Sequence, residues 1–369
     1  MITILVTGAG GGVGQGIIKS LRRIDDLELD IIAADASARA AGLFGVGRAA
    51  LLPRLKDPEY FATVMALCRE EAIDFYIPGT DIELPLCALM APTVERDCGT
   101  RIVISSPETI AIGNDKFATV QYLRRHNLPY PDTWLPGDVA ADALPYPVVV
   151  KPRVGWRSIG VNVVRDAEEL RRRLSSDRDV VIQEQIGCPD EEFTCTLVRC
   201  GNHVSNVAIF RRWLRGGDTY QAESVESELI EKYVLAIAGH LEIEGSCNFQ
   251  IRVGDDGQPK LFEFNPRCSG TTPLCAVIGF NPLEYYLKHK LAMPYEPCFQ
   301  VGMLILRHWA EVAVPMTSVT ALRMGHASPV PPVVLQSLPS AATAPPMARN
   351  GAAVPVVDGA QRETVPRLF

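Results

Sequence analysis

The sequence predicts an α/β region followed by an α+β region, and three observations lead to this prediction. In residues 1–113, short apolar runs that end in turn residues alternate with helical stretches, as in a parallel sheet covered by helices. From residue 114 to residue 310, strand-like runs follow one another as hairpins do. From about residue 315, Ala, Pro, Val and Ser dominate without periodicity, so residues 311–369 are expected to be a mostly disordered tail.

Length, charge and composition exclude several classes of protein. A chain of 369 residues is long enough for two or three domains. Its net charge of −7 leaves no basic surplus to neutralise phosphates, which argues against general binding of nucleic acid. No apolar run approaches the roughly 20 residues that span a bilayer. The chain begins with the strand-like "MITILVTG" rather than a signal peptide, so we expect a cytoplasmic protein that binds no membrane.

The ten cysteines and six histidines do not suggest a metal site or a disulfide framework. No C-x-x-C pair is present, and cysteines such as Cys247 and Cys275 stand among apolar residues. Buried free thiols are therefore expected. The histidines are dispersed along the chain, which disfavours a histidine cluster that binds a metal.

The elements of the first region follow from short apolar runs and one long amphipathic stretch. The helical stretch is "DPEYFATVMALCREEA", and the predicted strands are "TILVTG", "LDIIAAD", "FYIPG" and "RIVISS". The first strand leads into "VTGAGGGVGQG" and then a helix, which is the arrangement of a dinucleotide-binding unit. Asp35 follows the second strand, where a carboxylate could bind a ribose. An NAD-binding oxidoreductase is therefore one hypothesis, although any tight turn from strand to helix can carry such glycines.

The second region begins with a helix and continues mainly with strands. "NDKFATVQYLRRHNLPYP" predicts a helix that Asn114 caps and that Pro129 and Pro131 stop. Strand-like runs then lead to the helical "VESELIEKYVLAIAGHLEI". "CNFQIRVG" and "PKLFEFN" come next, joined by "DDGQ", and Asp-Gly between two strands indicates a hairpin.

Lys151 ends the β-branched run "PVVVK" and is followed by the loop "PRVGWRSIG". A lysine that leaves a strand beside a glycine-bearing loop is suited to binding phosphate, because the amine supplies charge and the loop amides close over the ligand. A surface lysine is the alternative on this evidence alone. The G-x-x-x-x-G-K-[ST] pattern is absent.

Polar side chains alternate with apolar ones in "KLFEFNPR". A strand there places Phe262 and Phe264 on one face and Glu263 and Asn265 on the other. Such oxygen ligands suit Mg²⁺, and Gln250 on the preceding strand could complete the site if the two strands pair. On that strand, the residues predicted to share the face of Gln250 are Asn248 and Arg252, and those predicted for the opposite face are Cys247, Phe249 and Ile251. A half-buried hairpin with a solvated polar face is the alternative.

The stretch "VVIQEQIGCPDEEFT" runs from an apolar strand into a polar hinge and then acidic residues. Backbone groups of a hinge at residues 184–186 could bind the edge of an adenine, and a following carboxylate could accept hydrogen bonds from ribose hydroxyls. An ordinary acidic turn is the alternative.

These three stretches, in this order, resemble the ATP-grasp superfamily, in particular the carbamoyl phosphate synthetase type and its stand-alone carboxylate–amine ligase relatives. The resemblance covers roughly residues 1–300, and "FEFNPRCSGTTPL" is its most specific part. It implies a Rossmann-like pre-ATP-grasp domain at residues 1–113 that usually binds no dinucleotide. It also implies ATP-grasp subdomains at residues 114–185 and 186–310.

The resemblance also implies roles for individual residues. Lys116 and Lys151 would bind the nucleotide, Lys151 and Arg267 would act in catalysis, and Glu192 would bind the ribose. The loop at residues 153–160 would be a phosphate lid, although it is poorer in glycine than many. The remaining implied ATP-binding residues are Gly155, Ser158, Glu184, Gln185 and Ile186. The implied Mg²⁺ ligands are Gln250, Glu263 and Asn265. The residues expected to line the substrate pocket are Gly10, Gly11, Thr80, Asp81, Glu83, Arg211 and Arg215.

The function that the resemblance implies is an ATP-dependent, ADP-forming ligase. It would use ATP with Mg²⁺, or Mn²⁺ in its place, to convert a small carboxylate into an acyl phosphate that an amine then captures. Three alternatives stay open: a carboxylate–thiol ligase that loads a carrier protein, an NAD-binding oxidoreductase, and a binding module that has lost turnover. A homodimer is an assembly that the sequence leaves open.

Overall fold

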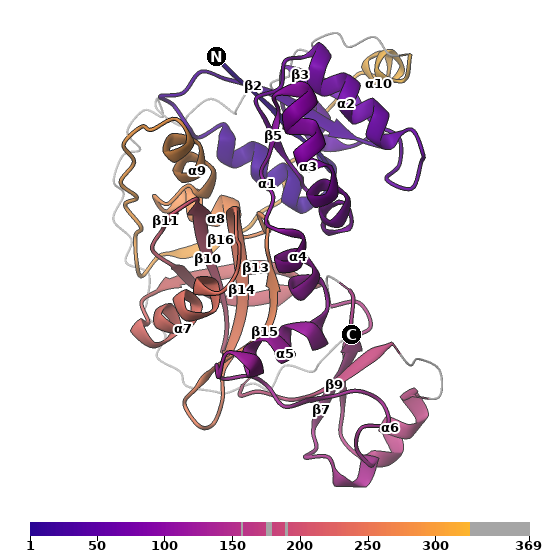
Figure 1. Cartoon of the computed structure of the whole chain (residues 1–369), viewed down its shortest axis with the longest axis vertical. Helices are drawn as coiled ribbons and strands as arrows, with labels where there is room; N and C mark the ends of the chain where they lie inside the picture. Colours follow the sequence, from indigo (N-terminus) through magenta and orange to yellow (C-terminus); the bar gives the residue numbers. More distant parts are fainter. Residues whose placement is uncertain (156–157, 175–178, 189–190, 325–369) are drawn as a thin grey trace, which may run out of the picture. The chain divides into compact units, whose positions relative to one another are not determined.

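A parallel sheet of five strands lies within residues 2–102 of the chain (Figure 1). The structure is a computed structural model that describes residues 1–155, 158–174, 179–188 and 191–324. In sheet order the strands are β3 (Arg48–Leu51), β2 (Leu29–Asp35), β1 (Ile2–Val6), β4 (Phe75–Ile77) and β5 (Arg101–Ile102). The four predicted strands are confirmed. β3 was not predicted, because the short "RAAL" shows no alternation of polar and apolar residues.

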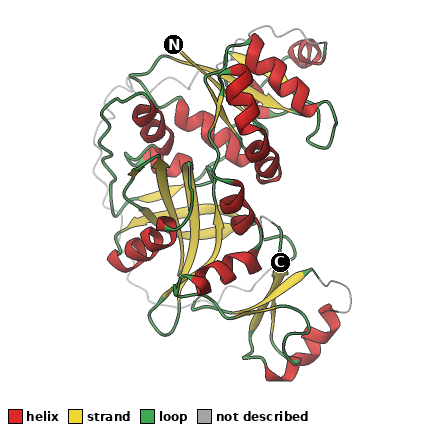
Figure 2. Cartoon of the chain, in the orientation of Figure 1, coloured by secondary structure: helices red, strands yellow, loops and turns green. Residues whose placement is uncertain are grey.

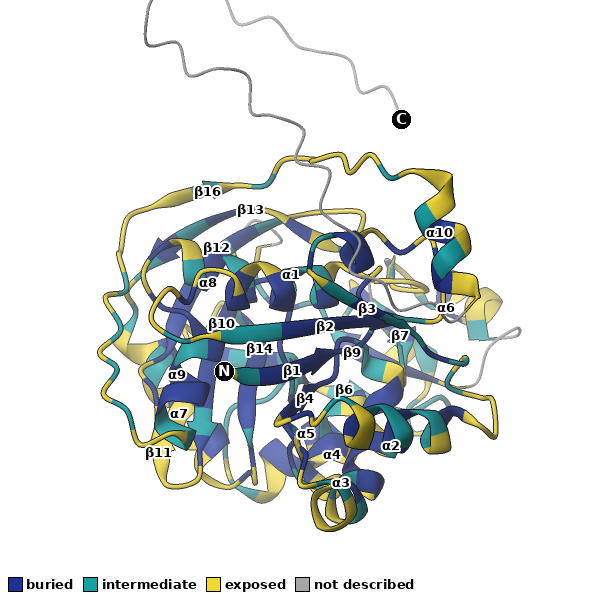
Figure 3. Cartoon of the chain, turned by 90° about the horizontal axis from the view of Figure 1, so that it is seen from above, coloured by how far each residue is buried: buried dark blue, intermediate teal, exposed yellow. Residues whose placement is uncertain are grey.

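Helices cover both faces of this sheet, as the prediction of a parallel sheet requires. Ile4 and Val6 of β1 belong to the same apolar cluster as Ile17 of α1 (Gly12–Leu21). Leu5, which points to the opposite face, packs with residues of α2 (Tyr60–Glu70) and α3 (Leu84–Cys98). β1 and β2 are largely buried (Figure 3). Only the first of these faces is shared with later parts of the chain, through α8 (Thr272–Val277) and α9 (Pro282–Lys290).

Two consecutive helices connect the parallel sheet to the second region. They are α4 (Pro107–Asn114) and α5 (Lys116–Arg125). The predicted cap at Asn114 is wrong by one residue: Asp115 is the N-cap of α5, and its carboxylate accepts from the backbone N–H groups of Phe117 and Ala118. Asp115 also binds Arg153, so the start of this helix is tied to the strand that carries Lys151.

A four-stranded antiparallel sheet carries Lys151. Its order is β6 (Thr133–Trp134), β9 (Val180–Glu184), β7 (Val148–Pro152) and β8 (Asn162–Val164), and α6 (Ala167–Leu174) packs on it through Leu170. Apolar residues from β7, β8 and β9 form one small core with this helix. Lys151 is therefore held on a strand rather than on a loop, which fixes its position.

A larger antiparallel sheet carries the predicted metal ligands (Figure 2). Its main path is β15 (Pro259–Asn265), β14 (Gly245–Val253), β10 (Glu192–Cys200), β12 (Ala208–Arg215), β13 (Asp218–Val225) and β16 (Leu304–Leu306), and β11 (His203–Val204) pairs with β10. One face packs on α7 (Glu228–Gly239). On the opposite face, part of the sheet shares the core that contains α8, α9 and the parallel sheet.

The expectation of a disordered tail is corrected at its beginning. Residues 316–323 form helix α10 (Met316–Arg323), whose Val319 and Leu322 are buried in the cluster that includes β1. "PMTSVTALRM" has apolar residues only every three residues or so, a short pattern that the surrounding Pro-rich composition obscures. The rest of the predicted tail, from residue 325, lies outside the described residues.

All ten cysteines lie in the described part of the chain and are free thiols, as expected, although Cys188 and Cys298 are exposed. Among the helices described, none is both long enough and apolar enough to cross a lipid bilayer.

Candidate functional site

Two adjoining cavities share a wall built from the large antiparallel sheet. The first has a volume of about 240 Å³ and the second about 340 Å³. Arg212, Gln250 and Glu263 line both. The first cavity is otherwise lined by the sheet of β7–β9 and its neighbours, and the second by the loops that end β1 and β4 and by the chain that follows β15. A ligand in one cavity would therefore meet a ligand in the other at these three side chains.

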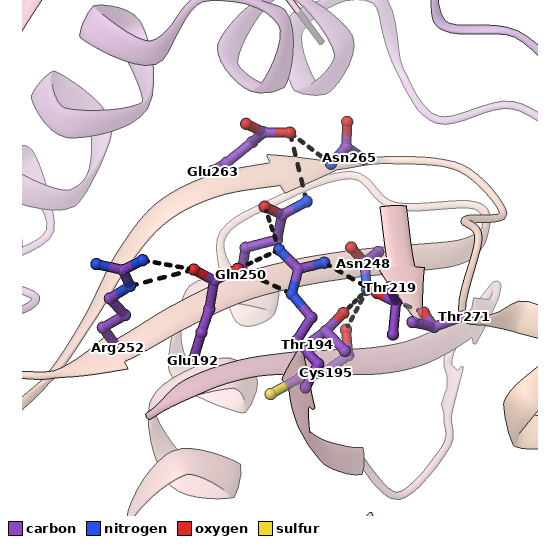
Figure 4. A network of polar contacts seen from close by, with 11 residues as sticks. Glu192, Thr194, Cys195, Thr219, Asn248, Gln250, Arg252, Glu263, Asn265 and Thr271 are labelled. Carbon is purple, nitrogen blue, oxygen red and sulfur yellow. Dashed lines mark hydrogen bonds and ion pairs between the residues drawn. The ribbon is translucent and has the colours of Figure 1, made fainter. Parts of the chain in front are cut away.

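The predicted metal ligands lie together on this wall (Figure 4). Gln250 on β14 pairs with Glu263 on β15, and Asn248 pairs with Asn265, so these side chains share one face as expected. Glu263 Oε1 accepts from Asn265 Nδ2 at 3.2 Å and from Gln250 Nε2 at 3.4 Å (Figure 4). Gln250, Glu263 and Asn265 are half-buried, as the alternative of a half-buried hairpin also expects, whereas Asn248 is buried, and the face forms a cavity wall.

Phe262 does not share a face with Phe264 as the alternation predicted. Phe264 is buried and stacks on Phe249, with ring centroids 6.0 Å apart. A β-bulge shifts the register after Gln250, so that Ile251 pairs with Leu261 and Phe262 has no partner. The ring of Phe262 consequently lines the first cavity, below Lys151 Nζ at 5.3 Å from its centroid.

Two buried lysines face the first cavity. Lys151 is 4% exposed, which rules out the alternative of a surface lysine, and its Nζ donates to Gln183 Oε1 at 2.8 Å and to the carbonyl of Phe262 at 3.3 Å. Burial and the nearby charge of Lys116 lower the pKa of Lys151 to about 7. Lys116 Nζ donates to the carbonyl of Gly155 at 2.9 Å and lies 3.9 Å from Glu263 Oε2.

Glu192 is buried between two arginines and also lines the first cavity. Its Oε2 accepts from Arg252 at 2.8 Å (Figure 4). Its Oε1 accepts from Arg212 at 2.5 Å. Burial works to raise the pKa of Glu192, but the two guanidinium groups outweigh it and lower that pKa. The resemblance implied a ribose ligand here. In this structure both carboxylate oxygens accept from protein cations, so Glu192 fixes the two arginines, and its role toward a ribose stays a prediction.

The predicted hinge and loop residues line the first cavity. Glu184, Gln185 and Ile186 follow one another along its wall, and Glu184 forms an ion pair with Lys260 at 2.7 Å. Gln185 Oε1 is buried and accepts no hydrogen bond, so it is available to a donor group on a ligand. Gly155 and Ser158 of the predicted lid also line this cavity, whereas residues 156–157 lie outside the described residues.

Arg267 projects into the second cavity together with part of the predicted substrate set. Gly11, Thr80 and Asp81 line this cavity. Arg267 donates to Asp81 Oδ1 at 2.6 Å and to Asn265 Oδ1 at 3.2 Å. This arginine therefore connects the loop after β4 to the predicted metal ligands.

The other predicted substrate residues line neither cavity. Glu83 is 3% exposed and accepts hydrogen bonds from Thr7, Thr80, Tyr60 and Tyr76, so it holds the loop together from inside. Gly10 uses its N–H to bind Asp35. The side chains of the two remaining arginines are engaged elsewhere, Arg211 with Glu223 and Arg215 over Tyr220. For these four residues the expectation is corrected.

Strand alternation explains the error at Arg211. Neighbouring residues of a strand point to opposite faces, and it is Arg212 that faces the cavities. Sequence reasoning missed Arg212 because "FRRW" places an arginine on each face and offers no signal to choose between them. It also missed Arg307, which lines the second cavity from a distant segment.

Asp35, which suggested a ribose-binding carboxylate of a dinucleotide site, has a structural explanation. Asp35 Oδ2 accepts from the N–H of Gly10 at 2.8 Å and Oδ1 from the N–H of Ser37 at 2.9 Å. Asp35 thus stabilises the glycine turn. Gly8 adopts a φ of 60°, and a Cβ on Gly14 would lie 2.3 Å from the carbonyl oxygen of Gly8, so the tight turn itself requires these glycines.

The side chains on the shared wall fit a magnesium nucleotide. The described residues contain no group of three or more His, Cys, Asp and Glu side chains that could hold a metal by themselves. Mg²⁺ commonly takes one or two carboxylates and completes its shell with water and substrate phosphates. Glu263 offers such a carboxylate beside two buried lysines that can bind phosphate. The amide oxygens of Gln250 and Asn265 accept from Arg212 and Arg267 in this structure, so these two side chains would have to turn to join the ion.

Comparisons with known proteins agree with this geometry. A family model described as ATP-grasp in the biosynthetic pathway with Ter operon matches residues 177–306. The carbamoyl phosphate synthase large chain of Methanothermobacter thermautotrophicus is 25% identical over 214 residues, which cover 50% of this chain and 20% of that protein. This chain therefore spans about a fifth of the length of that curated relative.

Solved structures share the fold at low sequence identity. The L-amino acid ligase from Bacillus licheniformis aligns with a TM-score of 0.61 at 19% identity, over 79% of this chain and 73% of that one. The carboxyaminoimidazole ribonucleotide synthase from Aspergillus clavatus, solved with ATP, aligns with a TM-score of 0.65 at 13% identity, over 88% and 86%. Residues 177–306 thus match an ATP-grasp family, and the chain is similar to carbamoyl phosphate synthases in sequence and to these two enzymes in fold.

Proposed function

We propose that this chain is an ATP-dependent ligase that activates a carboxylate as an acyl phosphate and joins it to an amine, with release of ADP and phosphate. The observation that carries the proposal is the wall shared by the two cavities, where Gln250 and Glu263 face both. A nucleotide in the first cavity would present its γ-phosphate there to a carboxylate in the second. The L-amino acid ligase that shares this fold supports an amine as the acceptor.

We further propose a division of the chain that follows its sheets. Residues 1–113 would form a Rossmann-like domain that supplies the glycine turn and the loop after β4 to the second cavity. Residues 114–185 and 186–310 would form the two ATP-grasp subdomains, each with one antiparallel sheet. The nucleotide would then lie between the two antiparallel sheets, whose residues line the first cavity.

In the first step of the proposed reaction, a carboxylate oxygen attacks the γ-phosphorus and ADP leaves. Lys116 and Lys151 would bind phosphate oxygens, and Gln185 Oε1 would accept a hydrogen bond from the adenine amine. Mg²⁺, held by Gln250, Glu263 and Asn265, would neutralise phosphate charge when bound. Positioning and charge neutralisation supply the catalysis, so no protein nucleophile is required.

In the second step, the amine attacks the carbonyl carbon, phosphate leaves with the C–O bonding electrons, and the amine loses a proton. Arg267 would stabilise the charge that develops on the acyl phosphate, because Asp81 and Asn265 hold its guanidinium at the edge of the second cavity. Asp81 contacts no reacting group in this scheme and acts as a positioning residue.

ADP release, measured over pairs of L-amino acids and other small carboxylates with MgATP, tests the proposal. Glu263→Gln should lower the rate about 100-fold or more, because Glu263 is the carboxylate of the donor set on the shared wall. Glu228→Gln, on an exposed face of α7, is the matched control and should leave the rate unchanged. A Glu263→Gln variant that turns over at the wild-type rate would contradict the metal assignment. Saturable binding of NADH in place of MgATP would restore the oxidoreductase hypothesis.

A further inference from the structure

Three arginines line the second cavity, and they differ in what balances their charge. Arg212 is paired with Glu192 at 2.5 Å and Arg267 with Asp81 at 2.6 Å. Arg307 takes part in none of the ion pairs found among the described residues. Its Nη1 donates to the carbonyl of Thr219 at 3.0 Å and its Nη2 to the carbonyl of Gly270 at 2.9 Å.

The structure holds Arg307 at the cavity wall through its backbone and through these two carbonyls. Leu306 pairs with Gln221 on β13, and the backbone N–H of Arg307 donates to Tyr220 at 3.2 Å. The guanidinium lies against Gly270, where a Cβ would be 3.7 Å from Nη1, an ordinary van der Waals contact. The guanidinium is therefore fixed rather than free to turn toward solvent.

The charge of Arg307 is only partly compensated. Burial lowers the pKa of Arg307, and the attraction of Asp218 works against that effect. Of the five N–H donors of a guanidinium, the two carbonyls occupy two, which leaves three for a ligand. A partly buried cation with unused donors is well suited to bind an anion.

Arg307 and the predicted metal ligands come from opposite edges of the large antiparallel sheet. Glu263 and Asn265 lie on β15, at one edge of the large sheet, whereas Arg307 directly follows β16 at the other edge. Both nevertheless line the second cavity. An anionic group bound by Arg307 would therefore contact the β16 side of this cavity, whereas Glu263 and Asn265 belong to the strand at the opposite edge of the sheet.

We propose that Arg307 binds a second, unreactive carboxylate of a substrate and thereby selects for substrates that carry one. This inference rests on the proposed ligase function and names the substrate class: a small molecule with one reacting group and one remote carboxylate. The planar guanidinium can donate two parallel hydrogen bonds to the carboxylate of a ligand. A ligand with an amide of the same shape in place of this carboxylate cannot accept both. Arg307 is then a specificity-determining residue of the second cavity.

Pairs of ligands that differ only in this charge provide the test. The probes are L-glutamate with L-glutamine, L-aspartate with L-asparagine, glutarate with glutaramate, and L-alanine with L-alaninamide. Affinities are measured by calorimetry at saturating MgADP, where no turnover occurs. At least one acid should bind the wild type about 10-fold or more tightly than its amide, as expected for one charge-assisted contact.

Three variants distinguish ligand binding from a structural role. Arg307→Gln should abolish the preference for the acid, and Arg307→Lys should retain part of it because the charge stays. Arg199→Gln is the matched control, since among the described residues Arg199 also donates only to backbone carbonyls, those of Gly201, Ala238 and Leu241, but lines neither cavity. It should keep the full preference. MgADP should bind all variants equally.

The outcomes separate this inference from the ligase proposal. The inference is overturned if no acid is preferred over its amide, or if the preference survives in Arg307→Gln. Failure of the wild type to bind MgADP would instead contradict the proposed function. The acid and amide probes would still report on Arg307 in the absence of nucleotide.

Discussion

The two lysines of the first cavity are held differently from two of the arginines that line the second. The Nζ atoms of Lys116 and Lys151 donate to neutral oxygens of Gly155, Gln183 and Phe262. Arg212 and Arg267 are bound by the carboxylates of Glu192 and Asp81. A cation bonded to a protein carboxylate contributes to stability and position, whereas a buried cation without such a bond is poised for an anionic ligand. The two sets should therefore respond differently to mutation.

The largest effect is expected where one carboxylate serves two cations. Glu192→Gln would leave Arg212 and Arg252 facing each other without their shared negative charge. Breaking such a buried pair costs about 3–5 kcal/mol of the free energy of unfolding. Chemical denaturation measures this loss, and Glu228→Gln on the exposed face of α7 should change the free energy by less than about 0.5 kcal/mol.

The pH dependence of stability sharpens this prediction. The two guanidinium groups hold the folded-state pKa of Glu192 below the usual 4.5 of a glutamate, so the stabilisation is complete above about pH 4.5 and is lost as the pH falls through the folded pKa. The Glu192→Gln variant should lack this part of the acid transition. If its unfolding free energy follows that of the wild type at all pH values, the two arginines are stabilised by other means.

A smaller effect, on affinity rather than stability, is expected at Lys151. Lys151→Met keeps the length of the buried side chain but removes its charge, so ATP affinity should fall by roughly 10- to 150-fold, as for one lost charge-assisted contact. The free energy of unfolding should change by about 1 kcal/mol or less, because only hydrogen bonds to neutral oxygens are lost. Calorimetry with MgATP measures the first quantity and denaturation the second. An affinity equal to that of the wild type would remove Lys151 from the site.

Predictions from the sequence succeeded where the alternation of polar and apolar residues along one strand determines the face on which a side chain lies. The alternation in "CNFQIRV" and "LFEFN" predicted that Gln250, Glu263 and Asn265 share a face, and their pairing confirms it. The same alternation failed at Phe262, because a bulge depends on how two strands pair and not on either strand alone. At Glu83 a local signal existed but was not used: Thr80 and Glu83 form a capping box, which predicts a structural role for the glutamate.

Tertiary pairing decides the features that the sequence could not show. Arg307 follows Gly270 by almost forty residues, and only the pairing of β16 with β13 brings the two side by side. No pattern in "LILRHWAE" marks an arginine that lines a cavity. Likewise, only the folded structure shows that Glu192 lies between two arginines, each from a different strand paired with β10.

The smallest effect is an uptake of protons when the nucleotide binds. Burial and the charge of Lys116 lower the pKa of Lys151 from 10.5 to about 7 in the free protein. The unfolded chain therefore holds more protons between pH 7 and 10.5, and the free protein gains stability as the pH rises through this range. Bound phosphates would favour the charged amine and raise its pKa again.

At pH 8, nucleotide binding should thus protonate Lys151 in most molecules, with an uptake of roughly 0.9 proton, and affinity should fall as the pH rises above 7. Titration of MgADP in HEPES and in Tris, whose ionisation enthalpies differ, measures the uptake. Lys151→Arg is the control, because a guanidinium is charged both before and after binding. An uptake at pH 8 that is the same in the wild type and in this variant would mean that Lys151 is already charged in the free protein. The two lysines and the two carboxylate-bound arginines would then differ in their partners but not in their readiness to bind an anion.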